Sequence, residues 1–131
     1  MTDTPVNLSQ ALAGFSDVYS PRIVGRVNDY DVRIAHVRGE HIWHVHEHTD
    51  EFFLVVSGEI EIGLREPTGE RTVTLPRGAL FLVPRGTFHK PSSKDGAVVL
   101  LVEPAGTVSV GDAHDEVPDH VEVTVGHPVE K

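Results

Sequence analysis

Residues 44–58, which read HVHEHTDEFFLVVSG, place imidazole and carboxylate groups directly before an apolar run. If the segment is extended, His44 and His46 project from the same face, because alternate side chains of a strand point the same way. Polar residues 47–50 bend the chain, and Glu51 opens the next apolar run on what would be a neighbouring strand. We therefore predict that two imidazoles and one carboxylate converge on one point, as ligands of a metal ion do.

A second stretch, residues 78–89, supplies a fourth ligand. It reads GALFLVPRGTFH, an apolar strand that ends at Pro84 and Gly86 and is followed by His89. Proline presets the backbone for a turn and glycine tolerates the conformations that a turn requires. We interpret these two residues as structural, because they fix the turn that aims His89.

The two stretches together resemble the two conserved sequence motifs of the cupin superfamily. The first motif matches as His44-x-His46, four residues, Glu51, six residues, Gly58, and the second as Gly78, five residues, Pro84-x-Gly86, two residues, His89. The nineteen residues between them resemble the spacing of small single-domain microbial cupins of the conserved-barrel type. The resemblance implies an all-β fold, a double-stranded jelly-roll β-barrel, with a metal bound by His44, His46, Glu51 and His89. Two positions depart from the family pattern, the spacing after Gly39 and Ser93 in place of asparagine.

The ligand types limit the metal without identifying it. The chain has no cysteine, so nitrogen and oxygen atoms must hold any ion. Three imidazoles and one carboxylate suit one divalent transition metal per chain, and Fe, Mn, Ni, Cu and Zn all remain open. Four protein ligands leave two positions of an octahedral ion for substrate, water or O₂, whereas four-coordinate zinc would be closed and inert.

The remaining histidines have weaker assignments. His48 is either a ligand or a histidine on the rim of the site, and His36 is either a hydrogen-bonding neighbour of the ligands or a core histidine with its own partners. His41 is expected to be exposed. No role is assigned to the histidines near the C-terminal end: His114, His120 and His127. Phe53, Val55 and Phe81 either wall the pocket or belong to the ordinary core.

Turn residues divide the chain into three parts. Residues 1–20 form an N-terminal arm with a short helix capped by Asn7 or Ser9, residues 21–103 form the barrel, and residues 104–131 form a surface tail with one docked strand. Strands are expected over residues 22–27, 30–37 and 42–46. A tight turn at Ser57-Gly58 is expected to return the chain into an alternating strand over residues 59–62.

Three apolar runs, residues 52–56, 79–83 and 97–102, lack the alternation of a half-exposed strand. They are too short and too rich in Val, Leu and Phe for buried helices, so we interpret them as strands covered on both faces. Since the chain offers almost no helix to cover them, the second face must meet another sheet or another subunit. We predict a homodimer.

Composition excludes several classes of partner. A chain of 131 residues fits one domain, and a net charge of −9 repels nucleic acid and anionic lipid surfaces. Residues 1–15 show neither the basic start nor the apolar segment of a signal peptide, and no apolar run reaches membrane-spanning length. We predict a soluble, cytoplasmic protein that binds a small molecule.

Two functions fit these observations. The first is an enzyme that acts on a small polar molecule at the metal, as a dioxygenase or an isomerase would. The second is a non-catalytic metal-bearing module that binds or senses a small molecule, because no general base stands out beside the ligands. A structural metal in an interaction protein is the remaining alternative, and no catalytic residue is assigned.

Overall fold

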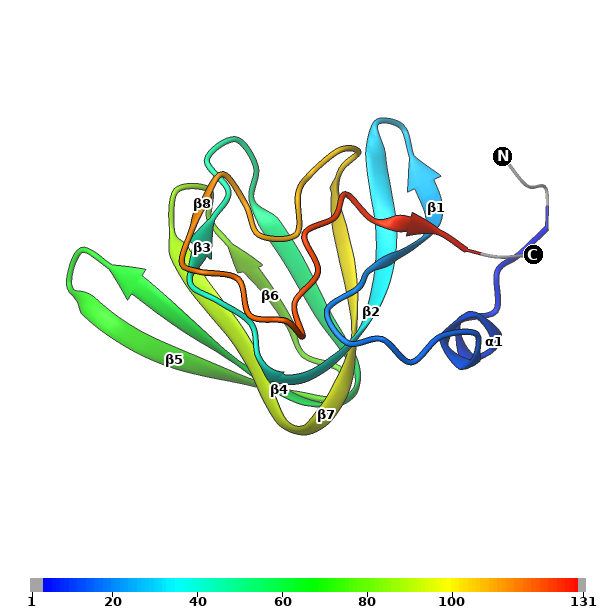
Figure 1. Ribbon diagram of the computed structural model, residues 1–131, viewed down its shortest axis with the longest axis horizontal. Helices are drawn as coiled ribbons and strands as arrows, with labels where there is room; N and C mark the ends of the chain where they lie inside the picture. The colour runs from blue at the N-terminus through cyan, green and yellow to red at the C-terminus, as the bar shows by residue number, and fades with distance from the viewer. Residues whose placement is uncertain (1–3, 130–131) are drawn as a thin grey trace.

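The computed structural model describes residues 4–129, in which one short helix precedes nine β-strands (Figure 1). The helix is α1 (Leu8–Ala13), and the strands are β1 (Arg22–Val27), β2 (Tyr30–Glu40), β3 (His44–Val45), β4 (Glu51–Glu66), β5 (Gly69–Pro76), β6 (Leu80–Val83), β7 (Phe88–Pro104), β8 (Ala113–His114) and β9 (His127–Pro128). The prediction of an all-β fold with a short N-terminal helix is confirmed.

Asn7 caps helix α1, and this confirms one of the two caps that we predicted from the sequence. Its side-chain oxygen accepts a hydrogen bond from the backbone N–H of Gln10 at 3.0 Å, and Gly14 ends the helix. The helix lies outside the barrel (Figure 1), where the carbonyl oxygen of Leu12 is 3.1 Å from Nε2 of His36 on β2. A second carbonyl, that of Phe15, lies 3.0 Å from the same nitrogen. His36 therefore anchors the N-terminal arm and is not a neighbour of the predicted ligands.

The strands pair in the order β5-β4-β7-β2-β1-β9. Strand β6 pairs with the first half of β4, while β3 pairs with both β7 and β8. The long strands β4 and β7 pair along almost their whole length and bend together, as the lower part of Figure 1 shows. This bend brings β3 and the beginnings of β4 and β7 to one region of the barrel.

The turn predicted at Ser57-Gly58 is wrong. Strand β4 runs without a break from Glu51 to Glu66, and both of its halves pair with β7, with register shifts on either side of Gly58. A hairpin would pair residues 59–62 with residues 52–56, but both segments already have β7 as their partner. Gly58 has φ +74°, so the glycine that suggested a turn serves a β-bulge that bends the strand.

The apolar runs cover the core with one face only. Their inward residues, which include Phe53, Val55 and Val99, are buried, but Leu80 and Leu82 on β6 are each 53% exposed. Cross-strand pairing aligns outward residues in two apolar rows. The rows are Leu100, Leu54, Leu80 and Val32, Val102, Phe52, Leu82; we call them the outer apolar rows. Ile34, which pairs with Leu100, is not included because the chain itself buries it fully. A single chain therefore covers one face of these strands and leaves the other open, and the prediction that another subunit covers it stays a prediction.

The segment after Pro104 packs more closely than a surface tail with a single strand. It contributes two short strands, β8 beside β3 and β9 parallel to β1, and neither includes residues 121–125, where valines alternate. Val110 and Val121 are 1% and 4% exposed and belong to the hydrophobic core. No helix among residues 4–129 is long and apolar enough to cross a membrane.

Candidate metal centre

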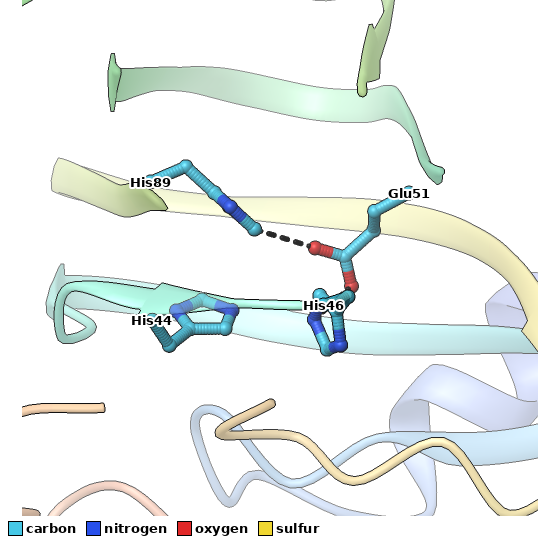
Figure 2. Close-up of side chains that lie close together, drawn as sticks. All are labelled: His44, His46, Glu51 and His89. Atoms are coloured by element: carbon cyan, nitrogen blue, oxygen red, sulfur yellow. Dashed lines mark hydrogen bonds and ion pairs between the residues drawn. The ribbon is translucent and has the colours of Figure 1, made fainter. Parts of the chain in front are cut away.

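Three strands bring the four predicted ligands together (Figure 2). His44 lies on β3 opposite His89 of β7, His46 follows β3 directly, and Glu51 begins β4. One nitrogen or oxygen atom from each of the four side chains lies within 4.8 Å of the others, and all four residues are buried. The sequence spacing therefore identified one cluster that forms in three dimensions.

Backbone carbonyl groups orient two of the imidazoles. Nδ1 of His44 lies 2.8 Å from the carbonyl oxygen of Ile42, and Nδ1 of His89 lies 2.9 Å from that of Thr87. Because a carbonyl oxygen only accepts, the proton of each ring must lie on Nδ1. Nε2 of His44 is then left with its lone pair toward the centre of the cluster, which is how protein hydrogen bonds prepare histidine ligands, whereas Nε2 of His89 faces an oxygen of Glu51.

The Glu51 carboxylate lies between two of the histidines. Its Oε1 is 2.8 Å from Nε2 of His89, and its Oε2 is 3.4 Å from Nε2 of His46. Ligands about 2.1 Å from an octahedral ion lie about 3.0 Å apart when adjacent and about 4.2 Å apart when opposite. The observed spacing thus fits a metal ion.

His46 gives a second indication of fit. Its Nε2 is buried and has no hydrogen-bond partner. Buried polar atoms are rarely left unpaired, and a bound cation would satisfy this one. The residues present therefore suit a nitrogen- and oxygen-coordinated divalent metal.

Burial and Glu51 set the protonation states in the cluster. Burial, together with the neighbouring His89 and His41, holds the pKa of His44 well below 6.5, which keeps the ring neutral and able to coordinate. Burial opposes protonation of His46 too, but the adjacent Glu51 carboxylate outweighs it and raises the pKa of His46. Burial would raise the pKa of Glu51, yet its two histidine partners lower it well below the usual value.

The structure overturns the expectation that His41 is exposed. His41 is only 8% exposed, and its ring centroid lies 4.7 Å from that of His44 and 4.9 Å from that of Tyr19. Burial lowers the pKa of His41 to about 4. The residue follows a Gly-containing segment that looked like a turn, but β2 continues through Glu40 and carries His41 inward.

A cavity of about 50 Å³ adjoins the cluster. His44 and Glu51 line it together with His41, Arg33 and Glu103, and its apolar walls include Phe53, Val99 and Leu101. Sequence reasoning missed Arg33 and Glu103. The sequence feature that could have found them is their position in the strand. Arg33 lies on the same face as Ala35 and Val37, and Glu103 lies on the same face as Leu101 and Val99, so both charged side chains point inward.

Burial raises the pKa of the Glu103 carboxyl well above its usual value, and the nearby charge of Glu51 adds to this effect. The opposite charge of Arg33, whose Nη1 lies 3.4 Å from Oε1 of Glu103, works against it. Arg33 is also paired to Asp31, with Nη2 at 3.0 Å from Oδ2. Asp31 pairs with a second guanidinium too, with Nε of Arg26 at 2.9 Å from its Oδ1, so two arginines stand beside the carboxyl groups of Asp31 and Glu103.

The other histidines lie outside the four-residue cluster. His48 is exposed and groups with Glu47 and Asp112 in a separate set of possible ligands on the surface. The three histidines near the C-terminal end bond elsewhere: His114 to the carbonyl of Asp115, His120 to that of Glu40, and His127 to Glu122. Phe53 walls the cavity, whereas Val55 belongs to the core and Phe81 packs against it.

The fold and the cluster define a β-barrel with an internal candidate metal site. The family model described as "Cupin domain" matches residues 32–103, and the chain belongs to this family. A solved cupin-2 domain containing protein from Shewanella frigidimarina is 33% identical, with a TM-score of 0.71, and the match covers 76% of this chain and 93% of that one. The predicted double-stranded jelly-roll barrel of the cupin superfamily is thus confirmed.

Two further proteins are similar. The uncharacterized protein YdbB from Bacillus subtilis is 38% identical over 80 residues, which cover 61% of this chain and 68% of YdbB. Protein NMB1881 from Neisseria meningitidis has a solved structure that is 26% identical with a TM-score of 0.68, and the match covers 77% of this chain and 99% of that one.

Proposed function

We propose that His44, His46, Glu51 and His89 hold one divalent transition metal, and that the protein is an enzyme which acts on a small polar molecule at this metal. The observation that carries the proposal is the adjoining cavity. Because His44 and Glu51 line both the cluster and the cavity, a molecule in the cavity lies beside the metal position. A bound metal supplies Lewis acidity or O₂ activation, and oxygenase and isomerase chemistry both use these properties.

The chain's own residues would prepare this chemistry. The carbonyls of Ile42 and Thr87 hold two imidazoles in the ligating tautomer, and burial keeps the ring of His44 neutral. Four protein ligands leave two positions of an octahedral ion open, which distinguishes a reactive site from a structural one. The apolar walls of the cavity limit the entry of water.

A non-catalytic module that binds or senses a small molecule is the second candidate function. Its supporting observation is the size of the cavity, about 50 Å³, which is only a few times the roughly 10–15 Å³ that one water requires. Such a site would hold a small ligand and release it unchanged.

Metal analysis of the protein, purified without added metal or chelator, tests the common part of both functions. We expect about one transition metal per chain, lost in His46→Ala and retained in His48→Ala, whose side chain is exposed and outside the cluster. Equal metal content in both variants would contradict the site. Turnover of diketones, catechols, thiols and small sugars by the Fe(II)-loaded protein with oxygen, or by Mn(II)- and Ni(II)-loaded protein, then separates the enzyme from the binding module, which would show saturable binding without product.

We further propose that the outer apolar rows bury themselves against a second copy of the chain. The exposed Leu80 and Leu82 continue, through hydrogen-bonded partners, into the half-buried Phe52 and Leu54. A contiguous apolar sheet face of this kind is typical of an interface. A two-fold homodimer places the same face of each chain against the other, as sheet packing allows.

A further inference from the structure

Within residues 4–129, three buried side-chain atoms have no hydrogen-bond partner: Nε of Arg33, Nε2 of His46 and Oε2 of Glu103. The proposed metal accounts for His46. The other two residues line the cavity that His44 and Glu51 also line. Unpaired buried polar atoms are uncommon in folded proteins, and here they gather around a single cavity, which indicates that its occupant is polar.

The two unpaired atoms belong to side chains that are otherwise fully engaged. Nη2 of Arg33 lies 3.0 Å from Asp31, and Nη1 donates to the carbonyl of Thr107 at 3.0 Å and faces Oε1 of Glu103 at 3.4 Å. The side chains of Arg33 and Glu103 are 1% and 3% exposed. The ion pair thus holds one free donor and one free acceptor in fixed positions inside the barrel.

We propose that Arg33 and Glu103 bind a hydroxyl group of a small neutral organic molecule that occupies the cavity. A hydroxyl oxygen accepts from Nε–H of Arg33, and its proton is donated to Oε2 of Glu103. This inference rests on the proposed function in one respect, that the other end of the bound molecule faces the metal. Binding of the hydroxyl group by Arg33 and Glu103 needs no metal. The inference deepens that proposal by naming the class of ligand.

Charge favours a neutral ligand over an anion. The guanidinium of Arg33 already serves ion pairs with Asp31 and Glu103, and the carboxylate of Glu51 lines the same cavity. A carboxylate or phosphate placed here would meet like charges at low dielectric. The small volume and the apolar walls restrict the rest of the molecule to a few carbon atoms.

Two probes with the same three-carbon skeleton test the inference. Propane-1,2-diol and lactate differ in that a hydroxymethyl group of the diol is a carboxylate in lactate. Each is titrated at pH 7 into ¹⁵N-labelled protein freed of metal, and the Nε–H resonance of Arg33 is followed by NMR. We expect a saturable shift of this resonance with the diol and binding of lactate that is at least ten-fold weaker. No shift of the Arg33 resonance, which would mean water only in the cavity, or tighter binding of lactate would overturn the proposal.

A matched pair of variants tests the role of Glu103. Glu103→Gln keeps the size of the side chain but replaces the acceptor oxygen Oε2 with an amide NH₂ group, so diol binding should weaken and the preference for diol over lactate should fall at least ten-fold. Glu61→Gln makes the same change at an exposed position on β4 and should leave the preference unchanged. Equal preferences in wild type and Glu103→Gln would contradict the assignment. If Glu103→Gln does not fold, the response of the Arg33 resonance in the wild-type protein still tests the proposal.

Calorimetric titration with Zn²⁺, which is diamagnetic, keeps this test separate from the test of the metal site. Zinc binding without any response of Arg33 to the diol would refute the hydroxyl site and leave the metal site standing. A response to the diol in a protein that binds no zinc would support the hydroxyl site and refute the proposed function.

Discussion

Oε1 of Glu51 lies 2.8 Å from Nε2 of His89, although 38 residues separate them in the chain (Figure 2). Glu51 is the first residue of β4, and His89 is the second residue of β7. The contact therefore shows that the beginnings of these two long strands lie close together. The other nitrogen of His89 faces the carbonyl of Thr87. Both ring nitrogens therefore face oxygen acceptors, and a cation between Nε2 and the carboxylate would satisfy both groups.

Metal affinity should fall as pH decreases, because protons compete with the metal for imidazole nitrogen. The Glu51 carboxylate raises the pKa of His46 above 6.5, so this ring competes first. We expect the dissociation constant for Zn²⁺ to rise at least about ten-fold per pH unit below about 6, where at least one proton must be displaced. Calorimetry between pH 7.5 and 5 in a non-coordinating buffer measures this change, and circular dichroism confirms that the protein stays folded. Full occupancy at pH 4 would argue against histidine ligation.

The four residues of the cluster could be predicted because their signal is local. His44 and His46 share strand parity, and Pro84 and Gly86 mark the turn before His89, so short-range patterns carry most of the site. Glu51 was predicted from its place at the start of the next apolar run, although this run, β4, pairs with β6 and β7 and not with β3 as expected.

The rest of the site depends on long-range geometry. Arg33 and Glu103 lie on strands whose parity marks them as inward, but charged residues are seldom placed in a core without knowledge of their partners. His41 becomes buried because β2 continues through Glu40, and Gly58 bends β4 because β7 pairs with both of its halves. Local propensity does not distinguish a bulge glycine from a turn glycine.

A charge on the outer apolar rows should separate the proposed dimer. Leu82 is 53% exposed in one chain and would be buried between two, so Leu82→Glu would place a charge in an apolar interface. Sedimentation velocity should show wild type at twice the 14.3 kDa chain mass and the variant at the single-chain mass. Val123→Glu is the matched control, since Val123 is 58% exposed and outside the rows, and should remain dimeric. A monomeric wild type at micromolar concentration would refute the interface.

His41 should make the metal-free protein less stable in acid. Its pKa is about 4 when folded and near 6.5 when unfolded, so between these values the unfolded chain binds more protons. Stability contributed by the neutral ring is present above pH 6.5 and is lost as pH falls toward 4, by up to about 3 kcal/mol. Urea unfolding at pH 7 and pH 4.5 should therefore show a smaller loss of stability in His41→Asn than in wild type. The exposed His48→Asn should lose as much as wild type, and an identical pH dependence in all three proteins would contradict the buried neutral state of His41.

Gly58 should be the least replaceable residue of the β4 bend. Its φ of +74° disfavours any side chain, and a Cβ there would overlap the carbonyl oxygen of Gly96 and lie 2.9 Å from Cα of Ala97. Both neighbours are backbone atoms of the paired strand β7, so they cannot move aside without opening the sheet. Gly58→Ala should lower the free energy of unfolding by at least about 2 kcal/mol, since the left-handed conformation alone costs about 1–2 kcal/mol.

Gly25→Ala is the control, because a Cβ at Gly25 of β1 meets no atom within 4 Å. It should change stability by less than about 1 kcal/mol. Urea denaturation at pH 7 compares the two variants at equal m-value, so that a shift in midpoint reports stability directly. Similar midpoints for Gly58→Ala and Gly25→Ala would show that β4 accommodates a side chain at this position, and hence that its bend does not depend on close contact with β7.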